Sequence, residues 1–255
     1  METKLNYSIP LNINMLAEVS STNALLKEQA MHGAAEGEVI IAESQTAGRG
    51  RRGRSFFSPD GSGLYLSLLL RPKLSAEEVA MLTTAAASAA ALAIEEVSHK
   101  TADIKWVNDI WLAGRKVCGI LCEAGYTPDG NIDHVIVGMG VNVVAPPEGF
   151  PAELADIAGA VFSAEAAPAD AKFAIAKAFL RHFTRFYANI GAREYFTEYK
   201  KRSFLLGQDI NVLRGGDAVP AVAVDINDEC HLLVRYPDGS EEYLSSGEVS
   251  VRLRV

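Results

Sequence analysis

The 255-residue sequence has few residues that could cross-link the chain or bind a structural metal. It contains three cysteines, Cys118, Cys122 and Cys230, and five histidines that lie far apart. The cysteines form neither an even set nor a CxxC pair, so the sequence predicts no disulfide framework and no structural zinc site. A long apolar run is also absent. The longest stretch without charge, residues 79–94, has 16 residues, whereas a membrane span needs roughly 20 apolar residues. We expect a buried helix there.

Neither an export signal nor an excess of positive charge is evident. No basic segment followed by an apolar stretch begins the sequence, so we expect a cytoplasmic protein with no membrane partner. The formal net charge is −8, which argues against general affinity for nucleic acid. The exception is residues 48–54, GRGRRGR, which contain four arginines. The rest of the chain therefore has a formal net charge of −12. A concentrated positive loop in an acidic chain indicates a site for a small anion.

Hydrophobic periodicity predicts a large α+β domain over residues 1–205 and a small all-β domain over residues 206–255. The expected helices begin near Thr22, run from Ser75 to about Val97, and cover 169–190 and 194–201, whereas the expected strands are 39–42, 64–70, 102–107, 109–112, 116–123 and 133–141. These segments predict a mixed sheet with helices packed on one side. From about Gly207, five short segments separated by turn sequences have the spacing of a small β-barrel.

The GRGRRGR segment, preceded by Gln45 and followed by Phe56 and Phe57, is the first motif with chemical potential. Glycines let the backbone approach an anion closely, and guanidinium groups offer paired donors to carboxylate and phosphate oxygens. Taken alone, the motif is as compatible with a solvated basic loop or a nucleic-acid tail as with a phosphate clamp. Its position between two apolar strands argues against a tail.

The second motif is KWVNDI at residues 105–110, at the end of an expected strand. Lys105 and Asn108 could hold phosphate oxygens, and Asp109 could bind magnesium or receive a proton. For this segment alone, an ordinary strand end and turn is the favoured interpretation, because Asn and Asp are common turn residues.

The third motif is RKVCGILCE at residues 115–123, an apolar strand that opens with Lys116 and contains Gly119. A lysine beside apolar residues can reach a buried carboxylate, and a strand glycine often marks close backbone approach to a ligand. An edge-strand lysine with no such role is the alternative. Cys118 and Cys122 share a face of this strand, which is more typical of core residues than of metal ligands.

In this order, the three motifs, with Ser21, Thr22 and Asn23 before them and GMGVN at residues 138–142 after them, resemble the biotin protein ligase family. The resemblance extends from about Ser20 to Arg252 and implies the monofunctional type, which lacks an N-terminal DNA-binding domain. It also implies a biotin/lipoate ligase-like catalytic domain followed by a small SH3-like β-barrel. The sequence departs from the family at Val107, where proline is usual, and at Phe56, where tryptophan is common, although either ring can stack on adenine.

The resemblance implies roles for individual residues. Residues implied for biotin binding are Ser21, Thr22, Asn23, Gln45, Gly48, Arg49, Arg51, Lys116, Gly119 and Gly138. Residues implied for nucleotide binding are Arg49, Arg54, Phe56, Lys105, Asn108, Asn142 and Arg252. Those implied as catalytic are Arg51, Lys116, Lys105 and Asp109. Asp109 is implied either as a Mg²⁺ ligand or as a group that helps deprotonate the acceptor lysine.

The implied reaction uses ATP and Mg²⁺ to convert biotin to biotinyl-5'-AMP, and then transfers biotin to a lysine of a biotin carboxyl carrier protein of a carboxylase. The biotin carboxylate and the α-phosphate of ATP are both anionic, so their charges must be neutralised and the two groups held in line. The mixed anhydride is labile in water, and loop 46–60 is its expected cover. A homodimer is compatible with the sequence.

Two alternative functions are weighed against this one. A lipoate or octanoate ligase resembles the biotin enzymes in fold and acyl-transfer chemistry, but polar pocket residues such as Ser21, Thr22 and Gln45 favour a ureido ring over an apolar tail. A DNA-binding repressor would need a helix-turn-helix domain. About twenty residues precede Ser21, which are too few for that motif, so we expect no DNA partner.

Overall fold

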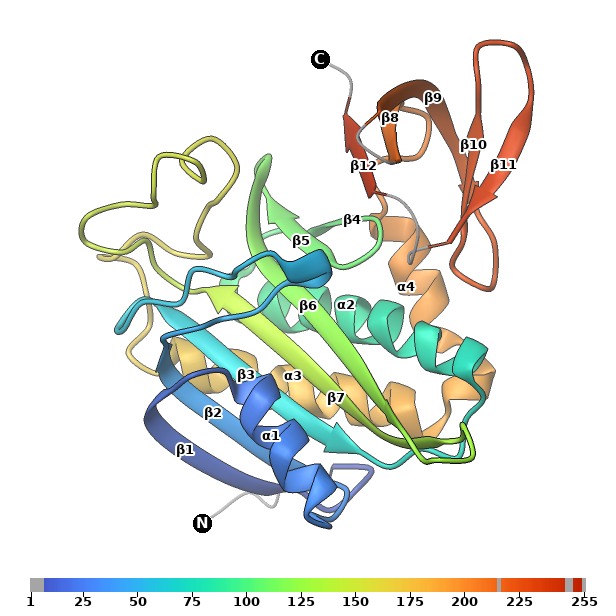
Figure 1. Ribbon diagram of the computed structural model, residues 1–255. Coiled ribbons are helices and arrows are strands. Elements are labelled where there is room, and N and C mark those ends of the chain that lie inside the picture. The colour runs from blue at the N-terminus through green and yellow to red at the C-terminus, as the bar shows by residue number, and fades with distance from the viewer. Residues whose placement is uncertain (1–6, 215–216, 246–249, 254–255) are drawn as a thin grey trace.

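The computed structural model describes residues 7–214, 217–245 and 250–253, of which residues 76, 77 and 250–253 are described by their backbone only. A large mixed sheet and its helices come first, and a second, smaller sheet lies toward the C-terminus (Figure 1). The elements of the first part are, in chain order, β1 (Asn12–Val19), α1 (Thr22–Met31), β2 (Glu38–Gln45), the 3₁₀ helix η1 (Arg51–Gly53), β3 (Gly63–Leu70), α2 (Ala76–Ser98), β4 (Asp103–Lys105), β5 (Asp109–Leu112), β6 (Arg115–Tyr126), β7 (Ile132–Asn142), α3 (Ala171–Ala188), the 3₁₀ helix η2 (Ile190–Ala192) and α4 (Glu194–Arg202).

The large sheet has seven strands in the order β1-β2-β3-β7-β6-β5-β4. The β1–β2 pair is parallel and the other pairs are antiparallel, which confirms the predicted mixed sheet. Strand β1 was not expected from the sequence. It lies at the edge of the sheet and nearly all of its side chains are exposed, so the buried-and-exposed alternation that indicates a strand is missing.

Helix α2 is the buried helix expected from the uncharged stretch. Its first turn carries the predicted capping box: the Ser75 hydroxyl accepts from the Glu78 N–H at 3.3 Å, and the Glu78 carboxylate accepts from the Ser75 N–H at 2.8 Å. Residues 78–98 are long and apolar enough to cross a membrane by length and composition alone, yet 72% of that window is buried. The stretch is therefore a core helix, packed against one face of the sheet and against α3 (Figure 1).

Helices cover both faces of the sheet, so the expectation that they lie on one side is wrong. Alternate residues of a strand point to opposite faces. Leu68 and Val137 belong to the core shared with α2 and α3, whereas their neighbours Leu69 and Ile136 pack against Leu26 of α1 on the other face. Figure 1 shows α1 in front of the sheet, with α2 and α3 behind it. The continuous apolar runs of β3 and β7 supply both contacts.

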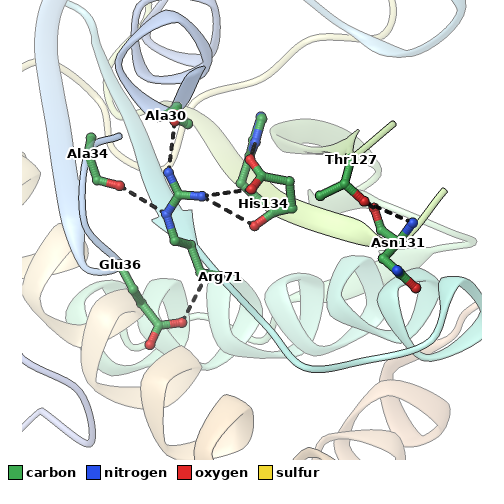
Figure 2. Close-up of polar contacts among 8 residues, drawn as sticks. Ala30, Ala34, Glu36, Arg71, Thr127, Asn131 and His134 are labelled. Carbon is green, nitrogen blue, oxygen red and sulfur yellow. Dashed lines mark hydrogen bonds and ion pairs between the residues drawn. The ribbon is translucent and has the colours of Figure 1, made fainter. Parts of the chain in front are cut away.

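Arg71, directly after β3, ties the C-terminal end of α1 to the sheet (Figure 2). Its guanidinium donates to the carbonyl oxygens of Ala30 at 2.8 Å and Ala34 at 3.0 Å, and forms an ion pair with Asp133 at 3.1 Å. Its backbone N–H donates to Glu36. The last carbonyls of a helix lack partners within the helix and attract positive charge. This clamp fixes the axis of α1 and hence the position of its N-terminal turn.

The C-terminal region contains β8 (Asp209–Arg214), β9 (Asp217–Ile226), β10 (Leu232–Arg235), β11 (Glu241–Leu244) and β12 (Ser250–Leu253). These five strands form one antiparallel sheet in the order β11-β10-β9-β8-β12. The five short strands predicted for a small SH3-like β-barrel domain are confirmed, and among the described residues they form one sheet that does not close on itself. The sheet ends at two four-residue strands, β11 and β12, that do not pair with each other.

The small sheet is attached to the large one at the segment that carries the second motif. The Trp106 indole N–H donates to the Cys230 carbonyl at 2.9 Å, and Lys200 of α4 forms an ion pair with Asp225 of β9 at 2.6 Å. Trp106 lies in the connection between β4 and β5. The C-terminal region therefore supports the connection that presents Asn108 and Asp109.

Candidate active site

A cavity of about 310 Å³ lies between the N-terminal turn of α1, the end of β2, the arginine-rich loop, the β4–β5 connection and the adjacent strands β6 and β7. The sequence-predicted residues that line it are Ser21, Thr22, Asn23, Gln45, Arg49, Arg51, Arg54, Phe56, Lys105, Asn108, Asp109, Lys116, Gly119 and Gly138. Segments far apart in the sequence thus meet around one space. Gly48 and Asn142 do not line it, and the side chain of Arg252 lies outside the described residues.

One end of the cavity is lined by uncharged polar groups from α1 and β2. Ser21 is the N-cap of α1 and is buried, as are Thr22 and Asn23. The Gln45 carbonyl oxygen accepts from the Thr22 backbone N–H at 2.9 Å and from the Thr22 hydroxyl at 3.2 Å. Gln45 also donates to Ser58 at 2.9 Å. These bonds hold the first turn of α1 against β2 and orient neutral donors and acceptors at the cavity wall.

The Asn23 amide completes this polar end. Its Oδ1 lies 2.6 Å from the Ser67 hydroxyl, and its Nδ2 donates to Glu123 at 2.9 Å and to the Leu121 carbonyl at 3.3 Å. A Cβ at Gly138 would lie only 2.1 Å from Asn23 Oδ1. The predicted glycine at 138 therefore makes room for an amide side chain, which is a packing role that its place in the motif did not reveal.

The opposite end of the cavity carries the charged groups. Lys116 of β6 and Asp109 of β5 form an ion pair at 2.7 Å, and both side chains are about a quarter exposed, at 29% and 25%. The pair follows from the antiparallel β5–β6 register, in which Asp109 faces Gly119. A Cβ at Gly119 would lie 3.4 Å from Lys116 Nζ, so the lysine side chain packs directly over this glycine.

Arg51 projects into the same end and contacts the β4–β5 connection. Its Nη1 donates to the Asn108 carbonyl oxygen at 3.3 Å, and the Asn108 amide in turn donates to the Ile120 carbonyl at 2.7 Å. Burial lowers the pKa of the Arg51 guanidinium, the neighbouring Arg52 lowers it further, and Asp109 opposes the shift. A cation that is partly removed from water and repelled by its neighbour is well placed to bind an anion.

The arginine-rich loop folds back on itself. Its limbs are joined by Gly50 N–H to the Arg54 carbonyl at 2.7 Å and Phe56 N–H to the Gly48 carbonyl at 2.9 Å. A Cβ at Gly48 would lie 2.4 Å from the Phe56 carbonyl oxygen, so Gly48 allows close packing of the two limbs. As a result, all four arginines line the cavity.

Phe56 covers a flat floor made by two glycines. Gly119 of β6 and Gly140 of β7 are cross-strand partners. A Cβ at Gly140 would lie 2.7 Å from the Phe56 ring, and one at Gly119 would lie 3.3 Å from it. The ring also meets Tyr65 edge-on, with centroids 6.4 Å apart. Gly140 was not among the predicted site residues. Its two-residue spacing from Gly138 could have indicated it, because residues i and i+2 of a strand lie on the same face.

Two cavity-lining residues and the contact that supports them could not be found from local sequence. Leu154 and Ile157 line the cavity because their segment runs alongside Lys116, whose N–H donates to the Ile157 carbonyl at 2.8 Å. Asn142 does not line the cavity but holds the segment that contains Leu154 and Ile157, because its amide donates to the Gly159 carbonyl at 3.0 Å. Tertiary contacts alone bring these residues to the site.

The cavity offers few ligands for a magnesium ion. Within the described ranges no group of three or more His, Cys, Asp or Glu could hold a metal, and Asp109 is the one described carboxylate that lines the cavity. Magnesium at phosphate sites is usually held by one or two carboxylates together with phosphate oxygens and water. A magnesium ion here would take at most one carboxylate, that of Asp109, and would need its other ligands from phosphate oxygens and water.

The arrangement agrees with the comparisons to known proteins. Residues 15–142 match the model of the Biotin/lipoate A/B protein ligase family, and residues 205–252 match the Biotin protein ligase C terminal domain. The chain is 44% identical over 140 residues to the bifunctional ligase/repressor BirA of Bacillus subtilis. That alignment covers 55% of this chain and 43% of the Bacillus protein, so it spans less than half of that relative.

Two other similarities extend over nearly the whole chain. The biotin–[acetyl-CoA-carboxylase] ligase of Mycobacterium tuberculosis is 32% identical over 250 residues, which is 95% of this chain and 89% of that protein. The biotin protein ligase of Aquifex aeolicus, solved in complex with biotin and ATP, superposes with a TM-score of 0.77 at 28% identity, covering 95% of this chain and 99% of that one. The chain therefore belongs to the biotin/lipoate A/B protein ligase family.

Proposed function

We propose that this protein is a biotin protein ligase that uses ATP to convert biotin to biotinyl-5'-AMP and then transfers the biotinyl group to a lysine of a biotin carboxyl carrier protein. The observation that carries the proposal is a single cavity with an uncharged polar end and a cationic end. Biotin has the same division, with a ureido ring at one end and a carboxylate at the other. Similarity to named biotin ligases supports the assignment.

The polar end suits the ureido ring. A ureido group has one carbonyl acceptor and two N–H donors, and the hydroxyls of Ser21 and Thr22 and the amide of Gln45 offer complementary partners. A lipoyl ring has no carbonyl or N–H group with which to make such bonds. Sites that hydrogen-bond a substrate discriminate strongly against analogues that lack the matching group. This argument favours biotin over the alternative substrate lipoate.

The cationic end suits the activation step. A carboxylate oxygen of biotin attacks the α-phosphorus of ATP, a new O–P bond forms, and the bond to pyrophosphate breaks. Two anions must approach each other, and fixed cations lower the energy of that encounter. Lys116, oriented by Asp109, and Arg51, oriented by Asn108, are the cations aimed at this space. A magnesium ion bound to the ATP phosphates would neutralise further charge, with Asp109 as its ligand.

The transfer step needs a neutral acceptor amine. The lysine nitrogen attacks the biotinyl carbonyl carbon, an amide bond forms, AMP leaves with its electron pair, and the amine loses a proton. Asp109 has this role as the alternative to magnesium binding: it is the described carboxylate that lines the cavity, and in a metal-free state it would accept that proton. Loop 46–60 and the Phe56 ring would keep water away from the anhydride until the acceptor arrives.

Mass spectrometry tests the substrate and the reaction together. The purified protein is incubated with ATP, magnesium, an isolated biotin carrier domain and either biotin or lipoate. We expect the mass of one biotinyl group on the carrier lysine with biotin, no lipoyl adduct, and biotinyl-5'-AMP when the carrier is omitted. A lipoyl adduct, or no product with a carrier domain that a known biotin ligase modifies, would contradict the proposal.

A further inference from the structure

Glu123 of β6 is a charged side chain that none of the roles above uses. Its side chain is only 19% exposed, and both carboxylate oxygens are engaged. One oxygen lies 3.2 Å from Arg49 Nη2, and the other accepts from Asn23 Nδ2 at 2.9 Å. Both partners line the cavity, but Arg49 comes from the arginine-rich loop and Asn23 from the first turn of α1. One carboxylate therefore joins the cationic loop to the polar end.

The contact with Glu123 determines which way the Asn23 amide faces. The two ends of an asparagine amide have nearly the same shape but opposite hydrogen-bonding character. A carboxylate can only accept, so it requires the NH₂ group of Asn23 on its side. The second N–H is taken by the Leu121 carbonyl, and Oδ1 accepts from the Ser67 hydroxyl at 2.6 Å and lies against Gly138, which leaves this oxygen one further lone pair. Asn23 thus presents an acceptor, not a donor, at the polar end.

We propose that Glu123 is a positioning residue that fixes this orientation of the Asn23 amide for recognition of ureido N–H groups. The inference rests on the proposed function, because the ureido ring supplies the donors that need an acceptor. Glu123 acts through Asn23, and its bond to Arg49 holds the carboxylate in place. A hydrogen bond to a charged group is stronger than one between neutral groups, so the carboxylate stabilises one amide orientation better than a neutral side chain can.

The test uses the isosteric variant Glu123→Gln. A glutamine side chain has one acceptor and one NH₂ group, so either Asn23 or Arg49 then meets a donor in place of an acceptor. We expect the Kd for biotin, measured by calorimetry, to rise about ten- to a hundredfold, the range that loss of a charged hydrogen bond corresponds to. The affinity for biotinol, which keeps the ureido ring but has no carboxylate, should fall by the same factor. In turnover, KM for biotin should rise with kcat little changed.

Glu95→Gln is the matched control. The Glu95 side chain is 24% exposed and forms an ion pair with Arg202 at 2.7 Å, away from the cavity. This variant should lower the thermal midpoint without changing the Kd for biotin or biotinol. Unchanged affinities for both ligands in E123Q, or an equal loss of affinity in E95Q, would overturn the proposal. A loss of affinity for biotin with no loss for biotinol would overturn it as well, because the substitution would then affect binding of the biotin carboxylate and not of the ureido ring.

A measurement without ligand separates this proposal from the proposed function. The side-chain amide protons of Asn23, followed by NMR in the ligand-free protein, should exchange slowly with solvent in the wild type. They should exchange faster and at altered chemical shifts in E123Q. Unchanged amide signals would refute the role of Glu123. A wild-type protein that binds no biotin would instead contradict the proposed function, whatever the amide signals show.

Discussion

The Gly138→Ala substitution should damage the polar end of the cavity out of proportion to the single methyl group that it adds. The new Cβ would lie 2.1 Å from Asn23 Oδ1, whereas ordinary contact begins at 3.4 Å, so the amide must move by about 1.3 Å. Such a shift would lengthen the 2.6 Å bond to Ser67 beyond hydrogen-bonding distance. The amide would also lose its alignment with Glu123.

The expected magnitude follows from these losses. Overpacking a core position costs about 1–3 kcal/mol, and a buried polar group left without a partner costs a similar amount. We therefore expect the free energy of unfolding of G138A to fall by about 1–3 kcal/mol. Because Asn23 lines the cavity, biotin should in addition bind about tenfold more weakly or worse. Urea titration gives the stability, and calorimetry on the folded protein gives the affinity.

The chain offers a matched control for overpacking. At Gly125, on the neighbouring strand β6, an added Cβ would lie 2.2 Å from the His134 ring, which is as severe a clash but does not involve the cavity lining. Gly125→Ala should lose comparable stability while its folded fraction keeps wild-type affinity for biotin. If G138A binds biotin as tightly as G125A does, then the position of the Asn23 amide does not matter for binding and the reasoning fails.

Two further predictions concern the cationic end and its loop, and a third concerns the net charge of the chain. Lys116→Ala and Arg51→Ala should each slow adenylate formation by on the order of 10²-fold or more, because each removes a cation aimed at the reacting anions; unchanged single-turnover rates and adenylate retention in both variants would contradict this. Trypsin should cut loop 46–60, whose Arg52 and Arg54 are exposed, markedly more slowly once biotin and ATP are bound; equal cleavage at demonstrated saturation would mean that the anhydride is shielded elsewhere. With a net charge of −8, the chain should bind duplex DNA at physiological salt no better than non-specifically, and tight sequence-selective binding in a titration would be decisive against that expectation.

Features that depend on neighbouring residues were predictable from the sequence alone. The Ser75–Glu78 capping box and the apolar run that follows it specify α2, because capping and helical periodicity act over a few residues. Apolar strands with turn residues between them specify β3, β6 and β7. The GRGRRGR motif concentrates positive charge where the rest of the chain is acidic, so the sequence alone predicts an anion site.

Only the tertiary structure decided which groups meet. The expected one-sided arrangement of helices was wrong because the choice of sheet face depends on residues far apart in the chain. Strand β1 was missed because an exposed edge strand carries little hydrophobic pattern. Glu123 stood in a recognised motif, yet its contact with Asn23 spans 100 positions of sequence. Local sequence determines the helices, the strands and the charge of the site. The sheet register determines which side chains orient one another, because cross-strand contacts form only when the chain is folded.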